Sequence, residues 1–542
     1  MWQLRFETYS GVLVPRHSIP FTKCILLAVV LALPCFSQDS SPSPQEAPIT
    51  TLRATSRLVV LDVVVTDRSG KPASPLSKDD FTILEDGKPQ TIASFESPEA
   101  HKYAIPKLDA QQTDRRTQSV SSALTILVID GLNTPLVDQA YAREAVVKFL
   151  RSHGPKLTQP TSLMLVTDTR LELVHDYTQD AGALLDALKR NKAELPFRYG
   201  ANDYALGETE RLLDTLSCLE RIAAANMNYA GRKNVVWIGQ GFPVLNFSRM
   251  GATRGPSIES DYQHRLIRLV SDTANEMWNA RLAIYTIDPR GLQVNSAGAN
   301  SAQPPQTDSP TLVDDPTGLR LFESIASETG GKITFNRNDV DVAVVDSVND
   351  GSSYYTLSYY PSNRNWNGKF RNIKVAISKP SVQARTRTGY YAAPDAPDSD
   401  ATLDSVLASA VKNPLPYRGL AMSVSFKILP GSPRTARFTV AADRHDLGWE
   451  TMPNGDHRCQ IMLVAMSVSR KERVAKTDIK ALEGIVKAGK FEKQMEKPML
   501  FTFTGDLPVD AVRLRVVVRD DKTGNIGTED LSTSESRMAR AN

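Results

Sequence analysis

The stretch "ALTILVIDGLNTPL", residues 123–136, decides the fold. Its apolar run from Leu124 to Ile129 stops at Asp130, and a short polar turn leads to Pro135. A continuous aliphatic run of this kind is typical of a strand buried on both faces of a parallel sheet. Pro135 at the first helical position, with Thr134 as the preceding cap, predicts that a helix follows. We therefore expect Asp130 and Thr134 at the carboxyl end of a central strand, where open α/β sheets bind ligands.

The residues that follow alternate regularly between strand and helix patterns. Apolar strands are predicted at 162–167, 171–175, 235–238, 282–287 and close to 333, and amphipathic segments separate most of them. This alternation favours a doubly wound, mostly parallel sheet with right-handed crossovers. The fold class expected for the whole chain is thus multidomain, α/β plus all-β.

Two flanking regions have the patterns of antiparallel strands. Residues 51–98 form a predicted small β module, in which Asp86-Gly87 lies between two strand runs and signals a hairpin. Residues 353–392 alternate polar and apolar side chains around a turn, so we expect a β-hairpin extension packed on the α/β domain. Several strands between residues 403 and 531 indicate an Ig-like β-sandwich.

The amino terminus indicates export. Arg5, Arg16 and Lys23 precede an apolar run, Cys24 to Leu33, and small residues follow near Ser37. This is the pattern of a signal peptide, and the apolar run is too short to span a bilayer core of about 30 Å as a helix. We expect a periplasmic or extracellular protein of a bacterial envelope, with no membrane span once the signal is removed. Retention of the segment as an anchor is the alternative.

Charge and cysteine content exclude some classes of function. The 542 residues carry a net charge of +3, which gives no reason to expect nucleic acid as a partner. Beyond the signal segment, the cysteines are Cys218 and Cys459, which we expect to be buried thiols. Two distant cysteines exclude a disulfide framework and a cysteine-based zinc site.

The predicted domain organisation follows from these composition changes. In chain order it is 1–37 signal peptide, 38–50 flexible leader, 51–98 β module, 99–121 linker, 122–352 α/β domain, 353–392 hairpin extension, 393–402 linker, 403–531 β-sandwich and 532–542 tail.

With this order established, the α/β part resembles a von Willebrand factor type A (VWA) domain, and the chain is similar to secreted VWA-related proteins of acidobacteria. The resemblance covers about residues 51–395. It depends on the combination of "LDVVVTDRSGKP" (61–72), "LTILVIDGLNT" (124–134), "GRKNVVWIGQGFP" (231–243), "IYTIDPRGL" (284–292), "ASETGGKITF" (326–335), "YYTLSYYPSN" (354–363) and "GKFRNIKVAI" (368–377).

The resemblance implies a degenerate metal site. VWA domains hold a divalent cation with an Asp-x-Ser-x-Ser motif, a loop Thr and a later Asp. Asp130 and Thr134 match the first and last motif positions, but Leu132 occupies the middle serine position and Gln240 the late aspartate position. One interpretation is a residual Mg²⁺ site at Asp130 and Thr134. The other is that Asp130 and Asn133 satisfy backbone groups of the turn and cap the helix.

A second acidic group lies in the first β module. Asp79, Asp80, Glu85 and Asp86 could help to bind calcium, since carboxylates are its preferred ligands. The alternative is that these side chains serve turn chemistry and a charged strand edge.

The sequence contains no nucleophile elbow, His-Glu-x-x-His motif or phosphate-binding glycine loop, so we expect no enzyme activity and no cofactor other than the Mg²⁺ considered above. The predicted function is an exported, non-enzymatic protein-binding or scaffolding role, with a protein partner and with Asn133 and Gln240 as candidate contacts. The alternatives are a metal-dependent adhesin that uses Asp130 and Thr134, and an envelope enzyme with an unrecognised site.

Overall fold

The computed structural model describes residues 57–73, 75–101, 123–167, 170–191, 204–229, 231–241, 256–292, 319–393, 400–430, 434–471 and 473–533. The predicted signal segment 1–37 and leader 38–50 lie outside the described residues, as do residues 102–122, 394–399 and 534–542 of the predicted linkers and tail.

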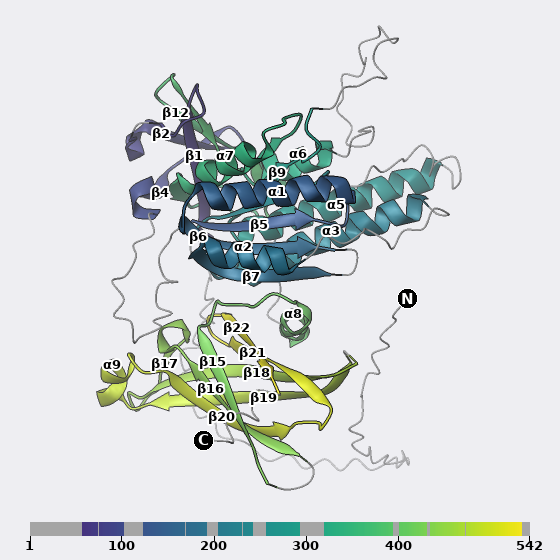
Figure 1. Ribbon diagram of the computed structural model, residues 1–542. Helices are drawn as coiled ribbons and strands as arrows, with labels where there is room; N and C mark the ends of the chain where they lie inside the picture. The colour runs from purple at the N-terminus through teal and green to yellow at the C-terminus, as the bar shows by residue number, and fades with distance from the viewer. Residues whose placement is uncertain are drawn as a thin grey trace, which may run out of the picture. The chain divides into compact units, whose positions relative to one another are not determined.

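A six-stranded mixed sheet forms the centre of the α/β domain (Figure 1). Its spatial order is β10-β9-β8-β5-β6-β7, and every neighbouring pair is parallel except β6 with the edge strand β7. The strand order therefore reverses between β5 and β8, which is where open α/β sheets form a ligand crevice. The strands are β5 (Leu124–Asp130), β6 (Lys156–Val166), β7 (Leu171–Asp180), β8 (Lys233–Ile238), β9 (Leu282–Ile287) and β10 (Lys332–Thr334).

Helices cover both faces of this sheet. Ile126 and Val128 of β5 belong to one hydrophobic cluster with α3, α5 and α6, whereas Leu127 and Ile129 belong to a second cluster with α1, α2 and α7. Every residue of β5 is buried, which confirms the prediction of a strand enclosed on both faces. The helices are α1 (Leu136–Ser152), α2 (Ala181–Arg190), α3 (Tyr204–Asn226), α5 (Pro256–Asn279), α6 (Leu319–Glu328) and α7 (Val340–Ser352).

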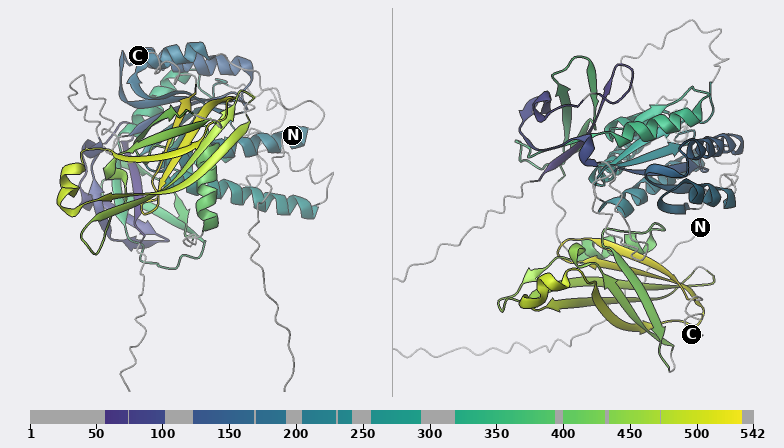
Figure 2. Two further views of the ribbon diagram at one scale, coloured as in Figure 1. Left: turned by 90° about the horizontal axis from the view of Figure 1, so that it is seen from below. Right: turned by 60° about the vertical axis from the view of Figure 1, so that its left-hand side comes forward.

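Strands from two distant parts of the sequence combine in a separate β module (Figures 1 and 2). One sheet has the order β13-β1-β11-β4 and the other β14-β12-β2-β3, with antiparallel pairing throughout. The strands are β1 (Val59–Asp67), β2 (Phe81–Glu85), β3 (Lys88–Gln90), β4 (Ile92–Glu96), β11 (Tyr355–Tyr359), β12 (Phe370–Ile377), β13 (Val382–Arg385) and β14 (Gly389–Tyr391).

This pairing differs from the hairpin extension expected at 353–392. The two strands of the expected hairpin, β11 and β12, lie in different sheets, where β11 pairs with β1 and β4, and β12 pairs with β2 and β14. A two-stranded hairpin buries too little apolar surface to be stable by itself. Leu61, Ile83 and Leu357 are each fully buried in one shared core, so strands from both segments complete one hydrophobic interior.

The hairpin predicted at Asp86-Gly87 is confirmed. Glu85 faces Lys88 across β2 and β3, so Asp86 and Gly87 form a two-residue loop. Their φ values are +49° and +77°. Positive φ at both central positions is the requirement of a type I′ turn, and Asp-Gly meets it at little cost.

The carboxyl-terminal region is built from antiparallel sheets behind a short helix, α8 (Asp400–Lys412). The sequence predicts five of its strands but misses β17, β19 and β22. Most side chains of β19 are exposed and show no regular apolar alternation. The strands are β15 (Met422–Ile428), β16 (Thr435–Ala442), β17 (Glu450–Thr451), β18 (His457–Ser469), β19 (Val474–Val486), β20 (Met499–Asp506), β21 (Ala511–Asp520) and β22 (Ile526–Ser532), with a one-turn helix α9 (Phe491–Gln494) before β20.

The two cysteines of the described residues are buried free thiols, as predicted. Burial raises the pKa of Cys218 to about 12 and that of Cys459 to about 11. Both side chains therefore stay protonated and unreactive at neutral pH.

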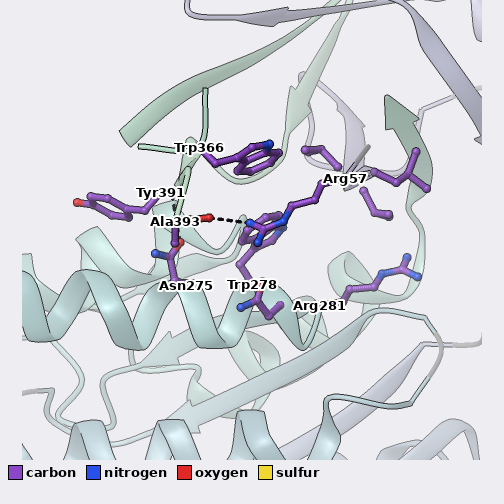
Figure 3. A pocket seen from close by; sticks show the side chains of 11 residues that line it. Arg57, Asn275, Trp278, Arg281, Trp366, Tyr391 and Ala393 are labelled. Carbon is purple, nitrogen blue, oxygen red and sulfur yellow. Dashed lines mark hydrogen bonds between the residues drawn. The ribbon is translucent and has the colours of Figure 1, made fainter. Parts of the chain in front are cut away.

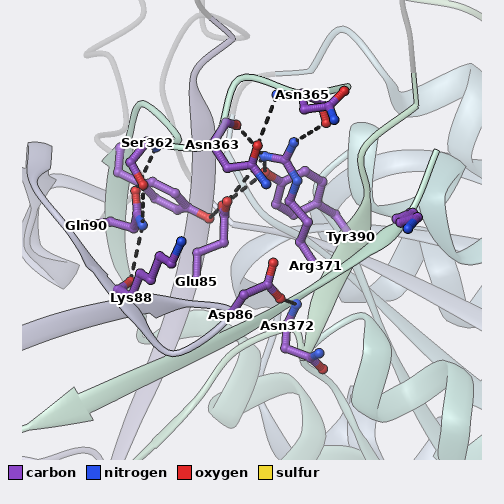
Figure 4. A network of polar contacts seen from close by, with 12 residues as sticks. Glu85, Asp86, Lys88, Gln90, Ser362, Asn363, Asn365, Arg371, Asn372 and Tyr390 are labelled. Carbon is purple, nitrogen blue, oxygen red and sulfur yellow. Dashed lines mark hydrogen bonds and ion pairs between the residues drawn. The ribbon is translucent and has the colours of Figure 1, made fainter. Parts of the chain in front are cut away.

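A buried ion pair lies within one sheet of the β module, and its carboxylate also bonds to the other sheet (Figure 4). The Arg371 guanidinium donates to Glu85 Oε1 at 3.2 Å, and both side chains are about 2% exposed. Glu85 Oε2 accepts from the hydroxyls of Tyr359 at 2.6 Å and Tyr390 at 3.0 Å. Because β11 and β2 lie in different sheets, the bond from Tyr359 ties one sheet to the other.

The other acidic side chains considered for calcium have structural partners. Asp80 accepts from the Ser77 backbone at 2.8 Å, and Asp86 accepts from the Asn372 backbone at 2.9 Å. No group of three acidic, histidine or cysteine side chains placed to hold a metal ion occurs among the described residues. The local geometry therefore favours turn chemistry for this group.

Replacing Glu85 by alanine should lower the free energy of unfolding of the module by about 3–5 kcal/mol, since the Arg371 charge stays buried without its carboxylate. Urea unfolding followed by tryptophan fluorescence measures the change. Asp79→Ala is the matched control, because Asp79 is exposed in the same segment and should change stability by less than about 0.5 kcal/mol. Equal effects of the two substitutions would contradict the role given to the ion pair.

Lys233 gives stability a specific pH dependence. Its ammonium is fully buried and donates to the carbonyls of Tyr229 at 2.6 Å and Ala280 at 2.7 Å. Burial lowers its pKa to about 7. Between about pH 7 and the unfolded-state value near 10.5, the unfolded chain binds a proton that the folded chain does not, so this residue makes stability rise with pH.

Lys233→Met should remove this rise. The difference in melting temperature between wild type and Lys233→Met should change between pH 7 and pH ~9.5, in the direction of relatively greater wild-type stability at the higher pH. Lys189→Met, at an exposed lysine of α2, should give a difference that does not depend on pH. A constant difference for Lys233→Met as well would refute the pKa assignment.

Candidate functional site

The end of β5 places Asp130 at the carboxyl edge of the sheet, beside β8, where the strand order reverses. The side chain is fully buried, and its carboxylate accepts four hydrogen bonds. Oδ1 accepts from the backbone N–H groups of Leu132 and Asn133, each at 2.9 Å. Oδ2 accepts from Asn133 Nδ2 at 3.1 Å and from Trp237 Nε1 at 3.2 Å. An ionised carboxylate has about four acceptor positions, so these donors use its capacity.

Trp237 is the residue of this site that sequence reasoning missed. It lies on β8 opposite Val128 of β5, and it is fully buried. A buried indole N–H needs an acceptor, and the carboxylate at the end of the neighbouring strand supplies it. The available signal was the tryptophan itself, which interrupts an otherwise aliphatic strand in "NVVWIG".

Thr134 does not cap α1 as predicted. Pro135 stands at the position before the first helical residue, and no side chain caps the helix there. Thr134 is fully buried, and its hydroxyl accepts from the Gln240 backbone N–H at 3.1 Å. The hydroxyl thus connects the turn after β5 to the turn after β8. Gln139 secures the same turn by donating to the Thr134 carbonyl at 2.8 Å.

Asn133 and Gln240, the two predicted partner contacts, are each half-buried. Asn133 does not cap the helix either, because its amide donates to Asp130 and, at 2.9 Å, to Thr215 Oγ1 of α3. Asn133 Oδ1 has no hydrogen-bond partner among the described residues. The Gln240 amide donates to the Asp138 carboxylate in the first turn of α1.

Gly239 allows this close approach of the two turns. A Cβ atom at this position would lie 2.5 Å from Asp130 Cβ and 2.9 Å from Thr134 Oγ1. Real side chains do not approach so closely, so any larger residue would push β8 away from Asp130. The glycine after "VVWI" is therefore a packing requirement of this site.

These residues do not fit a divalent cation. Magnesium requires several oxygen ligands in octahedral geometry. The acceptor positions of Asp130 are used by four N–H donors. Leu132 has no side-chain oxygen, and the Gln240 side-chain amide already bonds to Asp138. Burial raises the pKa of Asp130 although four hydrogen bonds favour its ionised form. The arrangement suits a fixed structural acceptor more closely than an open ligand.

Asp130→Asn tests this role directly. Asparagine keeps the size of the side chain but turns an NH₂ group toward N–H donors, so about two donors lose their acceptor. We expect the free energy of unfolding to fall by about 2–4 kcal/mol in urea titrations. Added magnesium should leave the melting temperatures of wild type and variant unchanged. Saturable stabilisation of wild type by magnesium, absent from the variant, would show that the site holds the ion.

Comparisons with known proteins give no family assignment. No family model matches this chain. No curated protein matches it either. Similar solved structures include an aerotolerance-related membrane protein from Bacteroides fragilis, with 12% identity over 42% of this chain and 99% of that chain and a TM-score of 0.25. The SpRpn10 VWA domain has 15% identity over 39% of this chain and 86% of that chain, with a TM-score of 0.19.

A third similar structure is that of three N-terminal domains of the type V pili tip protein Mfa5 from Porphyromonas gingivalis. It has 9% identity over 88% of this chain and 77% of that chain, with a TM-score of 0.25. At scores this low, these likenesses carry no argument about fold or function. The structure itself shows a mixed α/β chain with a six-stranded mixed sheet and several antiparallel sheets.

Proposed function

We propose that this chain is an exported, non-enzymatic protein-binding or scaffolding protein, built on a VWA-like, doubly wound α/β platform. In place of a metal ion, this platform has the hydrogen-bond network around Asp130. The flanking β module and the carboxyl-terminal domain, for which an Ig-like sandwich is our proposal, serve as spacers. Export rests on the residue pattern of 1–37. In the described residues, no helix is both long and apolar enough to cross a bilayer.

The observation that carries the proposal is the hydrogen bonding of Asp130. Its carboxylate is fully used by Leu132, Asn133 and Trp237, so the chain's own donors leave no carboxylate oxygen for a ligand. This edge of the sheet therefore offers a fixed surface without a reactive group. That combination supports recognition of a partner by contact and argues against catalysis at this edge.

Exposed apolar side chains follow the Asp130 turn on helix α1. In the first turns of α1, directly after the Asp130 turn, Leu136 is 40% exposed, Val137 68% and Tyr141 60%. Large apolar side chains exposed together on one helix favour a protein interface, and tyrosine is enriched at such surfaces. We propose that these residues, together with Asn133 and Gln240, form the contact surface for a protein partner.

A capture experiment tests this function. A photo-crosslinking residue at Val137 of the full chain should label a defined partner in intact cells, and Tyr141→Asp should reduce the labelling about tenfold or more, because a charge would enter an apolar contact. Val509→Asp is the matched control, since Val509 is 83% exposed and lies in the carboxyl-terminal domain. EDTA should have no effect.

Two outcomes would redirect the proposal. Labelling that EDTA abolishes would favour a metal-dependent adhesin, and equal labelling in Tyr141→Asp and in the control would remove the α1 surface from the interface.

A further inference from the structure

Arg387 is a buried cation without a hydrogen-bond partner. It lies in the short link between β13 and β14, and it is only 4% exposed. None of its three guanidinium nitrogens donates to an acceptor among the described residues. A guanidinium has five N–H groups, and buried polar groups of folded proteins are almost always hydrogen-bonded. Arg387 therefore differs from Arg371, an equally buried arginine that donates to Glu85.

The charge of Arg387 is not matched by a carboxylate of its own. Asp62 and Glu85 attract it, but each of them already has an arginine partner. Asp62 accepts from Arg281 Nε at 3.1 Å, and Glu85 accepts from Arg371 at 3.2 Å. Burial lowers the pKa of Arg387 to about 9, so the guanidinium still carries its charge at pH 7. Anions are attracted to a buried charge of this kind, because water screens it poorly.

Aromatic rings cover the guanidinium but do not satisfy its N–H groups. The guanidinium carbon lies 3.8 Å from the centre of the Trp278 ring and 5.6 Å from that of the Tyr390 ring. An aromatic face attracts a cation that lies over it. The N–H groups of a guanidinium lie in its plane, and they point away from a ring stacked on that plane. The edge of the Arg387 guanidinium is therefore the place that still needs an acceptor.

Trp278 gives this place room to accommodate an ion. Its ring also lines a cavity of about 530 Å³, which Figure 3 shows together with Trp366 and Tyr391. Trp278 is half-buried, so the ring has open space beside it on the cavity side. A ring packed on all sides could not move without disturbing its neighbours. Trp278 comes just before β9, at the amino edge of the α/β sheet, so this place is separate from the carboxyl edge that holds Asp130.

We propose that the guanidinium edge of Arg387 binds a small monovalent anion, chloride in the simplest case, in the contact between the β module and α5. The ion accepts the N–H bonds for which the described part of the chain supplies no acceptor. A single negative charge balances the single unmatched positive charge, so a monovalent ion suits the site better than a divalent one. The burial of Arg387 restricts the site to small ions.

Thermal unfolding of the full chain in mixtures of chloride and gluconate at constant ionic strength tests the proposal. Chloride should raise the melting temperature saturably, by about 2 °C or more, because an ion that binds only the folded chain stabilises it. Arg387→Gln removes the charge but keeps a polar side chain, and its melting temperature should not depend on chloride. Arg170→Gln is the matched control at an exposed arginine beside β7, and it should keep the wild-type dependence.

Arg387→Lys is a second variant, which serves where the glutamine variant does not fold. It keeps the positive charge but lacks the fork of parallel N–H groups, so the chloride concentration at half effect should rise about threefold or more. The proposal is overturned when the wild-type melting temperature does not depend on chloride, when a folded Arg387→Gln chain keeps the dependence, or when Arg387→Lys has the wild-type midpoint.

Discussion

The buried carboxylate of Asp130 is the constraint on which the central part of the structure depends. An ionised group that is removed from water must be compensated by hydrogen bonds, and here the compensation comes from two different elements. The turn after β5 supplies two backbone N–H groups, Asn133 supplies its amide and β8 supplies the Trp237 indole. The close contact of Gly239 with Asp130 follows from the same demand. The strands β5 and β8, between which the sheet reverses its order, are therefore locked together at their carboxyl ends.

The β module also depends on contacts between parts of the chain that are far apart in the sequence. Residues near the start of the chain and residues some three hundred positions later form its two sheets, and neither segment could bury its apolar side chains alone. Glu85 comes from the first of these segments and Arg371 from the second, and the two side chains meet in the interior of the module. Arg371 lies over the Trp366 ring within the module, and Arg387 of the module lies over the Trp278 ring of α5. The module therefore meets α5 through a contact between an arginine and a tryptophan.

The carboxyl and amino edges of the α/β sheet differ in the side chains and hydrogen bonds that they present. At the carboxyl edge of the sheet, both carboxylate oxygens of Asp130 accept hydrogen bonds from the chain itself. A partner could therefore contact the apolar side chains of α1 there. At the amino edge, arginine side chains lie over tryptophan rings, with Arg57 over Trp366 and Arg387 over Trp278. The two edges therefore differ in the side chains that they present.

The sequence by itself determined the elements whose cause is local. The unbroken apolar run at 124–129 predicted a strand with two buried faces, the alternation after it predicted the α/β sheet, and Asp86-Gly87 predicted a hairpin, because periodicity and turn chemistry are encoded by neighbouring residues. It also placed Asp130 and Thr134 at the end of the central strand. Only the tertiary structure decided that β11 and β12 belong to different sheets, that Thr134 bonds to Gln240 in place of a helix N-terminus, and that Trp237 takes one oxygen of Asp130. Each of these outcomes depends on which distant groups are close enough to share a hydrogen bond or a core, and that proximity is a property of the folded chain.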